Sequence, residues 1–202
     1  MTPQQLYNTI KRIYPHYEVA SICHTNKDCL RNGFCSNVQS VNVINFDFVK
    51  EDFYKGQTPT PASVDAVCVS TNGKQKFCFV EMKGWQQYMN KISRQKRTPE
   101  ETALGYNLAG KLNDSQQLCI DLVADKDLFS KISVQFLLVT DIDTKINGIE
   151  AFQSLLNQLG QTSSNLYSKC ITESCKVLES EIFIDKVYLT CKNFDQILNS
   201  IL

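Results

Sequence analysis

One stretch of the chain, Ser63 to Trp85, constrains the fold more than any other. Two apolar runs, VDAVCV and FCFVEM, flank an Asn-Gly pair, and this pattern is typical of a β-hairpin. Successive side chains of a strand point to opposite faces of the sheet, and the second run begins apolar on both faces. We therefore expect this run to be a strand covered on both sides, as in a layered α/β domain.

Two charged residues, Glu81 and Lys83, end the second run on the face that also carries Phe77 and Phe79. An unpaired charge in a covered strand costs several kcal/mol or is neutralised. Either the two residues pair with each other at a fraying strand end, or a bound cation stabilises the carboxylate.

The register of the hairpin decides whether Asp65, at the start of the first run, lies beside Glu81. A two-residue turn would pair Asp65 with Val80 and put Glu81 on the opposite face. A three-residue loop, with Gly73 in the left-handed conformation, would put Asp65, Glu81 and Lys83 on one face. Neighbouring carboxylates repel and need a proton or a cation, and Mg²⁺ prefers one or two carboxylates with waters and phosphate oxygens. We predict this second register.

The remaining elements follow from hydrophobic spacing. We expect helices over 2–13, about 99–123, 147–159 and at the C-terminus, and strands over 41–49, 132–140 and 182–190. Thr98, Pro99 and Glu101 form a helix-start pattern. With no repeats and no convincing linker, this order predicts a single α/β domain over residues 1–202.

Composition narrows the possible functions. The 202 residues carry 21 Lys+Arg and 21 Asp+Glu, so the formal net charge is zero and any nucleic-acid contact must rest on a local patch. No apolar run approaches the roughly 18 residues of a membrane helix, and the N-terminus lacks the features of a signal peptide. We expect an intracellular protein, cytoplasmic or nuclear, whose 9 cysteines are reduced.

Asp65, a turn and the strand-borne Glu81-Met82-Lys83 resemble the motif of the PD-(D/E)xK, or restriction-endonuclease-like, nuclease superfamily. The helix-strand-strand-strand-helix-strand order is similar to the core of that superfamily. The resemblance implies a central mixed β-sheet flanked by helices, with a core over about 1–140 and a C-terminal α/β extension over about 141–202. It also implies hydrolysis of phosphodiester bonds in DNA, less readily in RNA, with Asp65 and Glu81 binding Mg²⁺ or Mn²⁺ and Lys83 assisting the attacking water.

The chain departs from the superfamily pattern at two points. Val64 stands where a proline often precedes the aspartate, and the first predicted helix carries no acid. Glu18 and Asp47, the latter on the predicted strand 41–49, are the possible additional acids. An alternative function is therefore a catalytically inactive nuclease-like fold that acts as a nucleic-acid-binding or assembly subunit. A third is an unrelated α/β interaction protein in which Glu81 and Lys83 form a surface ion pair.

A basic run follows the hairpin. Its members are candidates for phosphate contacts, as is one lysine of the next helix: Lys91, Arg94, Lys96, Arg97 and Lys111. The other interpretation of the run is a solvated connector. Many nucleases of the resembled type act as dimers, so a homodimer or a larger complex is compatible with the resemblance.

Two further patterns favour ordinary roles. Cys23, Cys29 and Cys35 have the side chains of zinc ligands, but their spacing lacks the paired C-x2-C knuckles of structural zinc sites, so we expect buried or free thiols. Asp141 and Asp143 follow a predicted strand, as in haloacid-dehalogenase-type phosphatases. Lys145 replaces the residue that such a motif requires, so we expect both acids to be loop residues.

Overall fold

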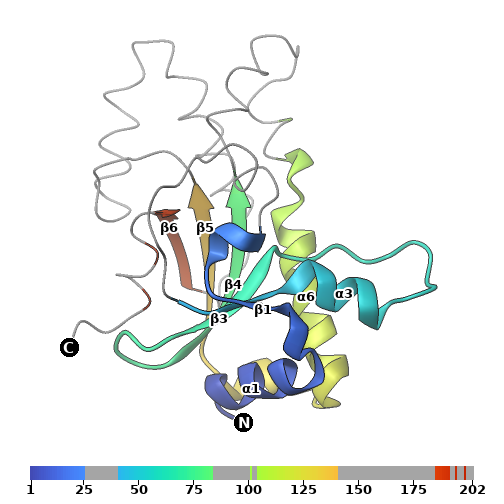
Figure 1. The fold of residues 1–202 in the computed structure, drawn as a ribbon, viewed down its shortest axis with the longest axis horizontal. Coiled ribbons are helices and arrows are strands. Elements are labelled where there is room, and N and C mark those ends of the chain that lie inside the picture. Colours follow the sequence, from blue (N-terminus) through green and yellow to red (C-terminus); the bar gives the residue numbers. More distant parts are fainter. Residues whose placement is uncertain are drawn as a thin grey trace.

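The computed structural model describes residues 1–25, 41–83, 101, 104–140, 185–191, 194 and 198. This part of the chain is an α/β fold in which a six-stranded mixed sheet packs against helices (Figure 1). The strands are β1 (Glu18–Val19), β2 (Val43–Asn45), β3 (Ala66–Ser70), β4 (Lys76–Lys83), β5 (Val134–Thr140) and β6 (Asp185–Thr190). The helices are α1 (Pro3–Ile13), α3 (Phe46–Phe53), α6 (Leu108–Val123) and α7 (Leu128–Lys131), with short 3-10 helices η1 (Pro15–Tyr17) and η2 (Ile22–Thr25).

The order of strands in the sheet follows their order in the chain. β1 to β4 are antiparallel neighbours, whereas β4, β5 and β6 run parallel. In Figure 1 the arrows of β4 and β5 lie side by side and point the same way. β4 therefore has a hydrogen-bonded strand on each side and lies in the interior of the sheet.

Helix α1 confirms the predicted N-terminal helix. A capping box begins it, since the Thr2 hydroxyl accepts from the Gln5 backbone N–H and the Gln5 side chain accepts from the Thr2 N–H. The helix buries Leu6 and Ile10 against the sheet and ends before Pro15.

The prediction of a strand over 41–49 is wrong for most of its length. Only Val43–Asn45 is extended, and α3 begins at Phe46. The Asn45 side chain accepts from the Phe48 backbone N–H, so this asparagine caps a helix where alternating apolar residues had indicated a strand. Asp47 consequently lies in the first turn of α3 and not on a strand.

The helix predicted over about 99–123 is interrupted. Glu101, Leu104 and Gly105 are helical, but α6 itself begins at Leu108, after Asn107 in the left-handed conformation with φ 49°. Asparagine tolerates this conformation better than most residues, which is why the chain can turn here and start a new helix. The predicted cap, Thr98-Pro99, lies outside the described residues, and the end at Val123 agrees with the structure.

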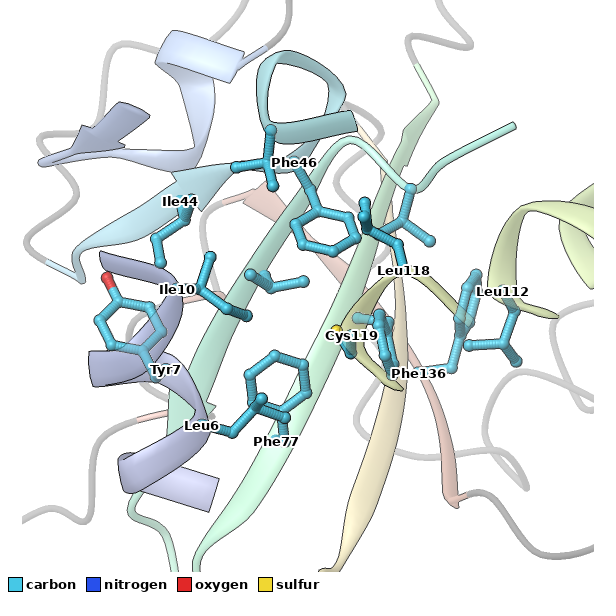
Figure 2. Packing of buried hydrophobic residues seen from close by; sticks show 14 of the residues in the cluster. Leu6, Tyr7, Ile10, Ile44, Phe46, Phe77, Leu112, Leu118, Cys119 and Phe136 are labelled. Atoms are coloured by element: carbon cyan, nitrogen blue, oxygen red, sulfur yellow. The ribbon is translucent and has the colours of Figure 1, made fainter. Parts of the chain in front are cut away.

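Both faces of the sheet are covered, as the hairpin pattern predicted. On one face Phe77, Phe79 and Phe136 pack against α1, α3 and α6, and Figure 2 shows this packing from close by. On the other face Cys78, Val80 and Leu137 pack with Phe194 and Leu198, two helical residues near the C-terminus. The central strands are thus fixed from both sides.

Several predictions fall on residues that the structure does not describe. They include the helix 147–159, the start of the strand 182–190 and the aspartates of the phosphatase-like pattern, Asp141 and Asp143. The strand 132–140 is confirmed as β5, and β6 confirms residues 185–190 of the last predicted strand. Within the described ranges, none of the helices combines the length and apolar composition that crossing a membrane requires.

Candidate functional site

The register of the hairpin brings Asp65 and Glu81 together. Ala66 pairs with Val80 and Ser70 with Lys76. If this register is continued by one residue, Asp65 stands opposite Glu81 and on the same face of the sheet, as predicted. The loop between the last paired residues spans Thr71–Gln75 and is longer than the predicted three residues. Gly73 in this loop has φ +69°, as predicted.

Asp65 stands one residue before β3, at the point where the β3–β4 ladder ends. Its backbone carbonyl accepts from the Phe46 N–H at 3.0 Å. Its carboxylate oxygen Oδ2 accepts a hydrogen bond from the Met82 backbone N–H at 2.6 Å. Met82 belongs to β4, the strand that carries Glu81. The carboxylate therefore replaces a backbone acceptor at the strand end, and this fixes its position beside β4.

Glu81 is fully buried in the interior strand. Its Oε1 accepts from Lys83 Nζ at 2.5 Å and from Lys111 Nζ at 2.7 Å. Its other oxygen, Oε2, is buried and has no hydrogen-bond partner within the part of the chain that the structure describes. One side of a buried carboxylate thus has two charged donors and the other side has none.

The Glu81–Lys83 pair exists, but not in the form of a surface ion pair or a frayed strand end. Lys83 is the last residue of β4, but this end of the strand is hydrogen-bonded and not frayed, because Met82 pairs with Val139 and Lys83 with Thr140 on β5. The Lys83 side chain is 17% exposed and that of Glu81 0%. The ion pair is therefore part of the covered sheet.

Tyr106 and Lys111 add two contacts from the helical segment that covers this face. Lys83 Nζ lies 4.7 Å from the centroid of the Tyr106 ring, a cation–π distance. Lys111 lies in the first turn and a half of α6 and its side chain is 22% exposed. Lys111, which the sequence indicated as a candidate phosphate contact, thus donates a hydrogen bond to the Glu81 carboxylate.

Burial and the charges of the site shift two pKa values. Burial and the neighbouring Glu81 raise the pKa of Asp65 from 3.8 to about 7, although Lys111, Lys83 and the Met82 N–H act in the opposite direction. Burial lowers the pKa of Lys111, but the charges of Glu81 and Asp65 outweigh it, so this pKa lies above its ordinary value. Near neutral pH, the Asp65 carboxyl group is therefore partly protonated, whereas Lys111 stays charged.

Helix α6 also holds the segment that leads into Asp65. The Asp114 carboxylate accepts from the Ala62 N–H at 2.9 Å, and the Ser115 hydroxyl accepts from the Val64 N–H at 3.0 Å. Ser115 and Val64 are both buried. The same helix thus positions Asp65 through the backbone and contacts Glu81 through Lys111.

The two candidate additional acids have other partners. Asp47 Oδ1 accepts from the Ser63 hydroxyl at 2.5 Å and from Lys50 Nζ at 3.2 Å, so it supports the segment before Asp65. Glu18 accepts from the Tyr7 hydroxyl at 2.9 Å and pairs with Lys11 at 2.8 Å. These contacts tie Glu18 to α1.

No cluster of three or more His, Cys, Asp or Glu residues that could hold a metal ion occurs among the described residues. Cys68, Cys78 and Cys119 are buried free cysteines. Cys29, Cys35 and the basic run lie outside the described residues, and the members of that run are Lys91, Arg94, Lys96 and Arg97. A site built from described residues alone therefore has two carboxylates, Asp65 and Glu81.

Sequence reasoning missed Tyr106. Its contact with Lys83 depends on the interruption before α6, which no pattern in the sequence indicates. Comparison with family models, with curated proteins and with solved structures gave no match.

Proposed function

We propose that this chain is a metal-dependent nuclease that hydrolyses phosphodiester bonds, in DNA rather than RNA. The observation that carries the proposal is the Glu81 carboxylate, fully buried beside Asp65 with its Oε2 lacking a donor among the described residues. Buried polar atoms in folded proteins nearly always have a partner, so an orphaned carboxylate oxygen favours a missing cation.

The donor set suits Mg²⁺ or Mn²⁺. Mg²⁺ is commonly held by one or two carboxylates, with waters and phosphate oxygens completing its shell. Asp65 and Glu81 supply those two carboxylates, and the pKa of Asp65 near 7 lets a cation displace its proton at neutral pH. A divalent ion bound there would polarise the phosphate and lower the pKa of a water molecule.

The chain's own residues have defined roles in this proposal. The Met82 N–H fixes the Asp65 carboxylate, and the interior strand β4 fixes Glu81. The Lys83 ammonium orients the attacking water and stabilises the negative charge that develops on the phosphate. The Tyr106 ring holds that ammonium in place.

The fold supports the same proposal. The elements α1, β2, β3, β4, α6 and β5 occur in the helix-strand-strand-strand-helix-strand order of the restriction-endonuclease-like core. Three further elements interrupt this order: the short strand β1 before β2, α3 between β2 and β3, and α7 between α6 and β5. Glu81 lies in β4, one strand of the hairpin, and Asp65 directly precedes β3, the other strand. We propose that the described sheet is a core of this type.

The test is cleavage of plasmid and single-stranded DNA by the purified chain with Mg²⁺ or Mn²⁺. Asp65→Asn, Glu81→Gln and Lys83→Met each remove a charge with little change of volume. Each should reduce the cleavage rate by about 100-fold or more, as expected when one preorganised electrostatic group is removed. Lys126→Met, at an exposed position in the turn after α6, is the matched control and should cut as the wild type does. Equal cutting by all four variants would reveal a contaminating nuclease and remove the proposal.

One observation favours a second candidate, the catalytically inactive nucleic-acid-binding or assembly subunit. Lys83 and Lys111 already offset the charge of Glu81 without any ion. This function predicts retention of DNA that weakens with added salt and no cleavage with either metal.

A further inference from the structure

The two lysines on Glu81 are held differently. Lys83 belongs to the same strand as Glu81, and its ammonium also lies over the Tyr106 ring at 4.7 Å. Lys111 reaches Glu81 from α6, and within the described part its ammonium donates a hydrogen bond to Glu81 Oε1 alone. Lys83 therefore keeps its contact with the Tyr106 ring when Glu81 is engaged elsewhere. The other described groups that attract the Lys111 charge are the carboxylates of Asp65 and Asp47, and Asp65 belongs to the same site.

The position of Lys111 in α6 is electrostatically unfavourable without Glu81. It is the fourth residue of a 16-residue helix whose first turn contains no acidic side chain. The amino end of a helix carries partial positive charge and repels an ammonium group. Glu81 compensates for this repulsion, so a ligand that takes over Glu81 also weakens the attachment of Lys111.

A divalent cation on Asp65 and Glu81 would add two positive charges next to two ammonium groups. Two carboxylates then face a total of four positive charges, and the nearest like charges repel most strongly in a covered site. The Lys111 side chain is 22% exposed and has a long flexible stem, so it can move its charge towards water.

We propose, given the metal-dependent function above, that Lys111 is a built-in competitor of the divalent cation for Glu81. With no cation bound, Lys111 neutralises the buried carboxylate. When a cation binds, Lys111 leaves Glu81, and its ammonium becomes available to a phosphate oxygen of the nucleic acid. Lys111 is thus a positioning residue that acts through Glu81. It lowers the affinity of the site for the cation, whereas a metal ligand raises it.

The test is Mn²⁺ binding to the DNA-free protein, followed by electron paramagnetic resonance. Lys111→Gln should bind Mn²⁺ at least about tenfold more tightly than the wild type, because a nearby positive charge is removed. Lys126→Gln changes the net charge equally at an exposed, distant position and should bind as the wild type does. Unchanged or weaker binding in Lys111→Gln would overturn the inference.

The failures of the two proposals are distinguishable. If the wild type and Lys126→Gln bind no Mn²⁺, the metal-dependent function fails and the competitor role fails with it. Suppose instead that the wild type binds Mn²⁺ and that Glu81→Gln abolishes this binding. If Lys111→Gln then gains no affinity for Mn²⁺, only the competitor role fails.

A measurement on the wild type covers the case in which Lys111→Gln does not fold. The lysine ammonium groups are followed by ¹⁵N nuclear magnetic resonance, with Lys111→Arg used to assign the Lys111 signal. Adding diamagnetic Mg²⁺ should move the Lys111 signal towards that of solvated lysines and leave the Lys83 signal protected. A Lys111 signal that stays protected at saturating Mg²⁺ would contradict the inference.

Discussion

Glu81 imposes the strictest physical requirement on any explanation of this site. A purely structural ion pair is stable in a protein interior only when hydrogen bonds satisfy the remaining lone pairs of its carboxylate. Glu81 has two ammonium donors on Oε1 and none on Oε2 among the described residues. This asymmetry is expected when one oxygen is reserved for a ligand, and it is our reason for proposing a bound cation in place of a purely structural network.

Asp65 leads to a prediction about the pH dependence of stability. Its pKa is about 7 in the folded protein against 3.8 for the unperturbed group. Between these values the folded protein binds a proton that the unfolded chain does not, so the free energy of unfolding falls as pH rises. The contribution is complete below pH 3.8 and is lost as pH passes about 7. Its size is about 2 to 4 kcal/mol, the lower figure allowing for the partial exposure of Asp65.

Urea unfolding of the wild type and of Asp65→Asn at pH 4.5 and pH 7.5 measures this contribution. The asparagine keeps an oxygen for the Met82 N–H but has no titrating proton. From the lower to the higher pH, the wild type should lose about 2 to 3 kcal/mol more than the variant, because part of the contribution is already lost below pH 4.5. Parallel changes in the two proteins would show that Asp65 titrates normally.

At the scale of elements, helix α6 links the two halves of the site. Ser115→Ala removes the acceptor of the buried Val64 N–H, one residue before Asp65. An unsatisfied buried backbone donor costs about 1 to 3 kcal/mol, and the better helix propensity of alanine returns about 0.5 kcal/mol. We expect the free energy of unfolding to fall by about 1 to 2 kcal/mol, measured by urea unfolding, and Mn²⁺ binding to weaken because Asp65 is less firmly placed.

Ser130→Ala is the matched control for this substitution. Ser130 also makes a hydrogen bond, from its hydroxyl to the Asp127 carbonyl, but at an exposed position near the end of α7. Its replacement should change stability by less than about 0.5 kcal/mol. Similar losses in the two variants would mean that the Ser115 contact has no special role in holding the site.

The elements that the sequence predicted well are those with one unambiguous period. The helical spacing of Leu6 and Ile10 predicted α1. The two apolar runs around Gly73 predicted β3 and β4, in the register that puts Asp65 and Glu81 on the same face. Residues 41–49 failed because alternating apolar residues also suit a helix entry when an asparagine such as Asn45 caps it. Local capping chemistry prevailed over periodicity there.

The site was predictable only in part for a related reason. Glu81 and Lys83 lie on β4, and Asp65 directly precedes the neighbouring strand β3. Strand alternation and the choice between two hairpin registers were therefore enough to bring them together. Lys111 and Tyr106 reach the same place from a helical segment, and their contacts depend on where α6 begins and how it packs. Tertiary packing of this kind leaves no periodic trace in a sequence.

At the scale of the whole molecule, the charge balance limits how nucleic acid can be held. With 21 basic and 21 acidic residues there is no net positive field, so phosphate binding must come from a few local contacts. The basic run is the densest group of such residues in the sequence, and it begins eight residues after Lys83, the last residue of β4. We therefore expect Arg94 and Arg97 to make phosphate contacts.

The salt dependence of DNA binding tests this expectation, measured without divalent ions so that no cleavage occurs. Each phosphate contact contributes about 0.9 to the slope of log affinity against log salt concentration for duplex DNA. Replacing Arg94 and Arg97 together by glutamine should reduce the slope by about 2 and weaken binding to all sequences alike. Replacing Lys74 and Lys126, both exposed, changes the net charge equally and should leave the slope unchanged. A general electrostatic attraction would respond equally to both double variants, so only an effect confined to the arginine pair supports a local phosphate-binding patch.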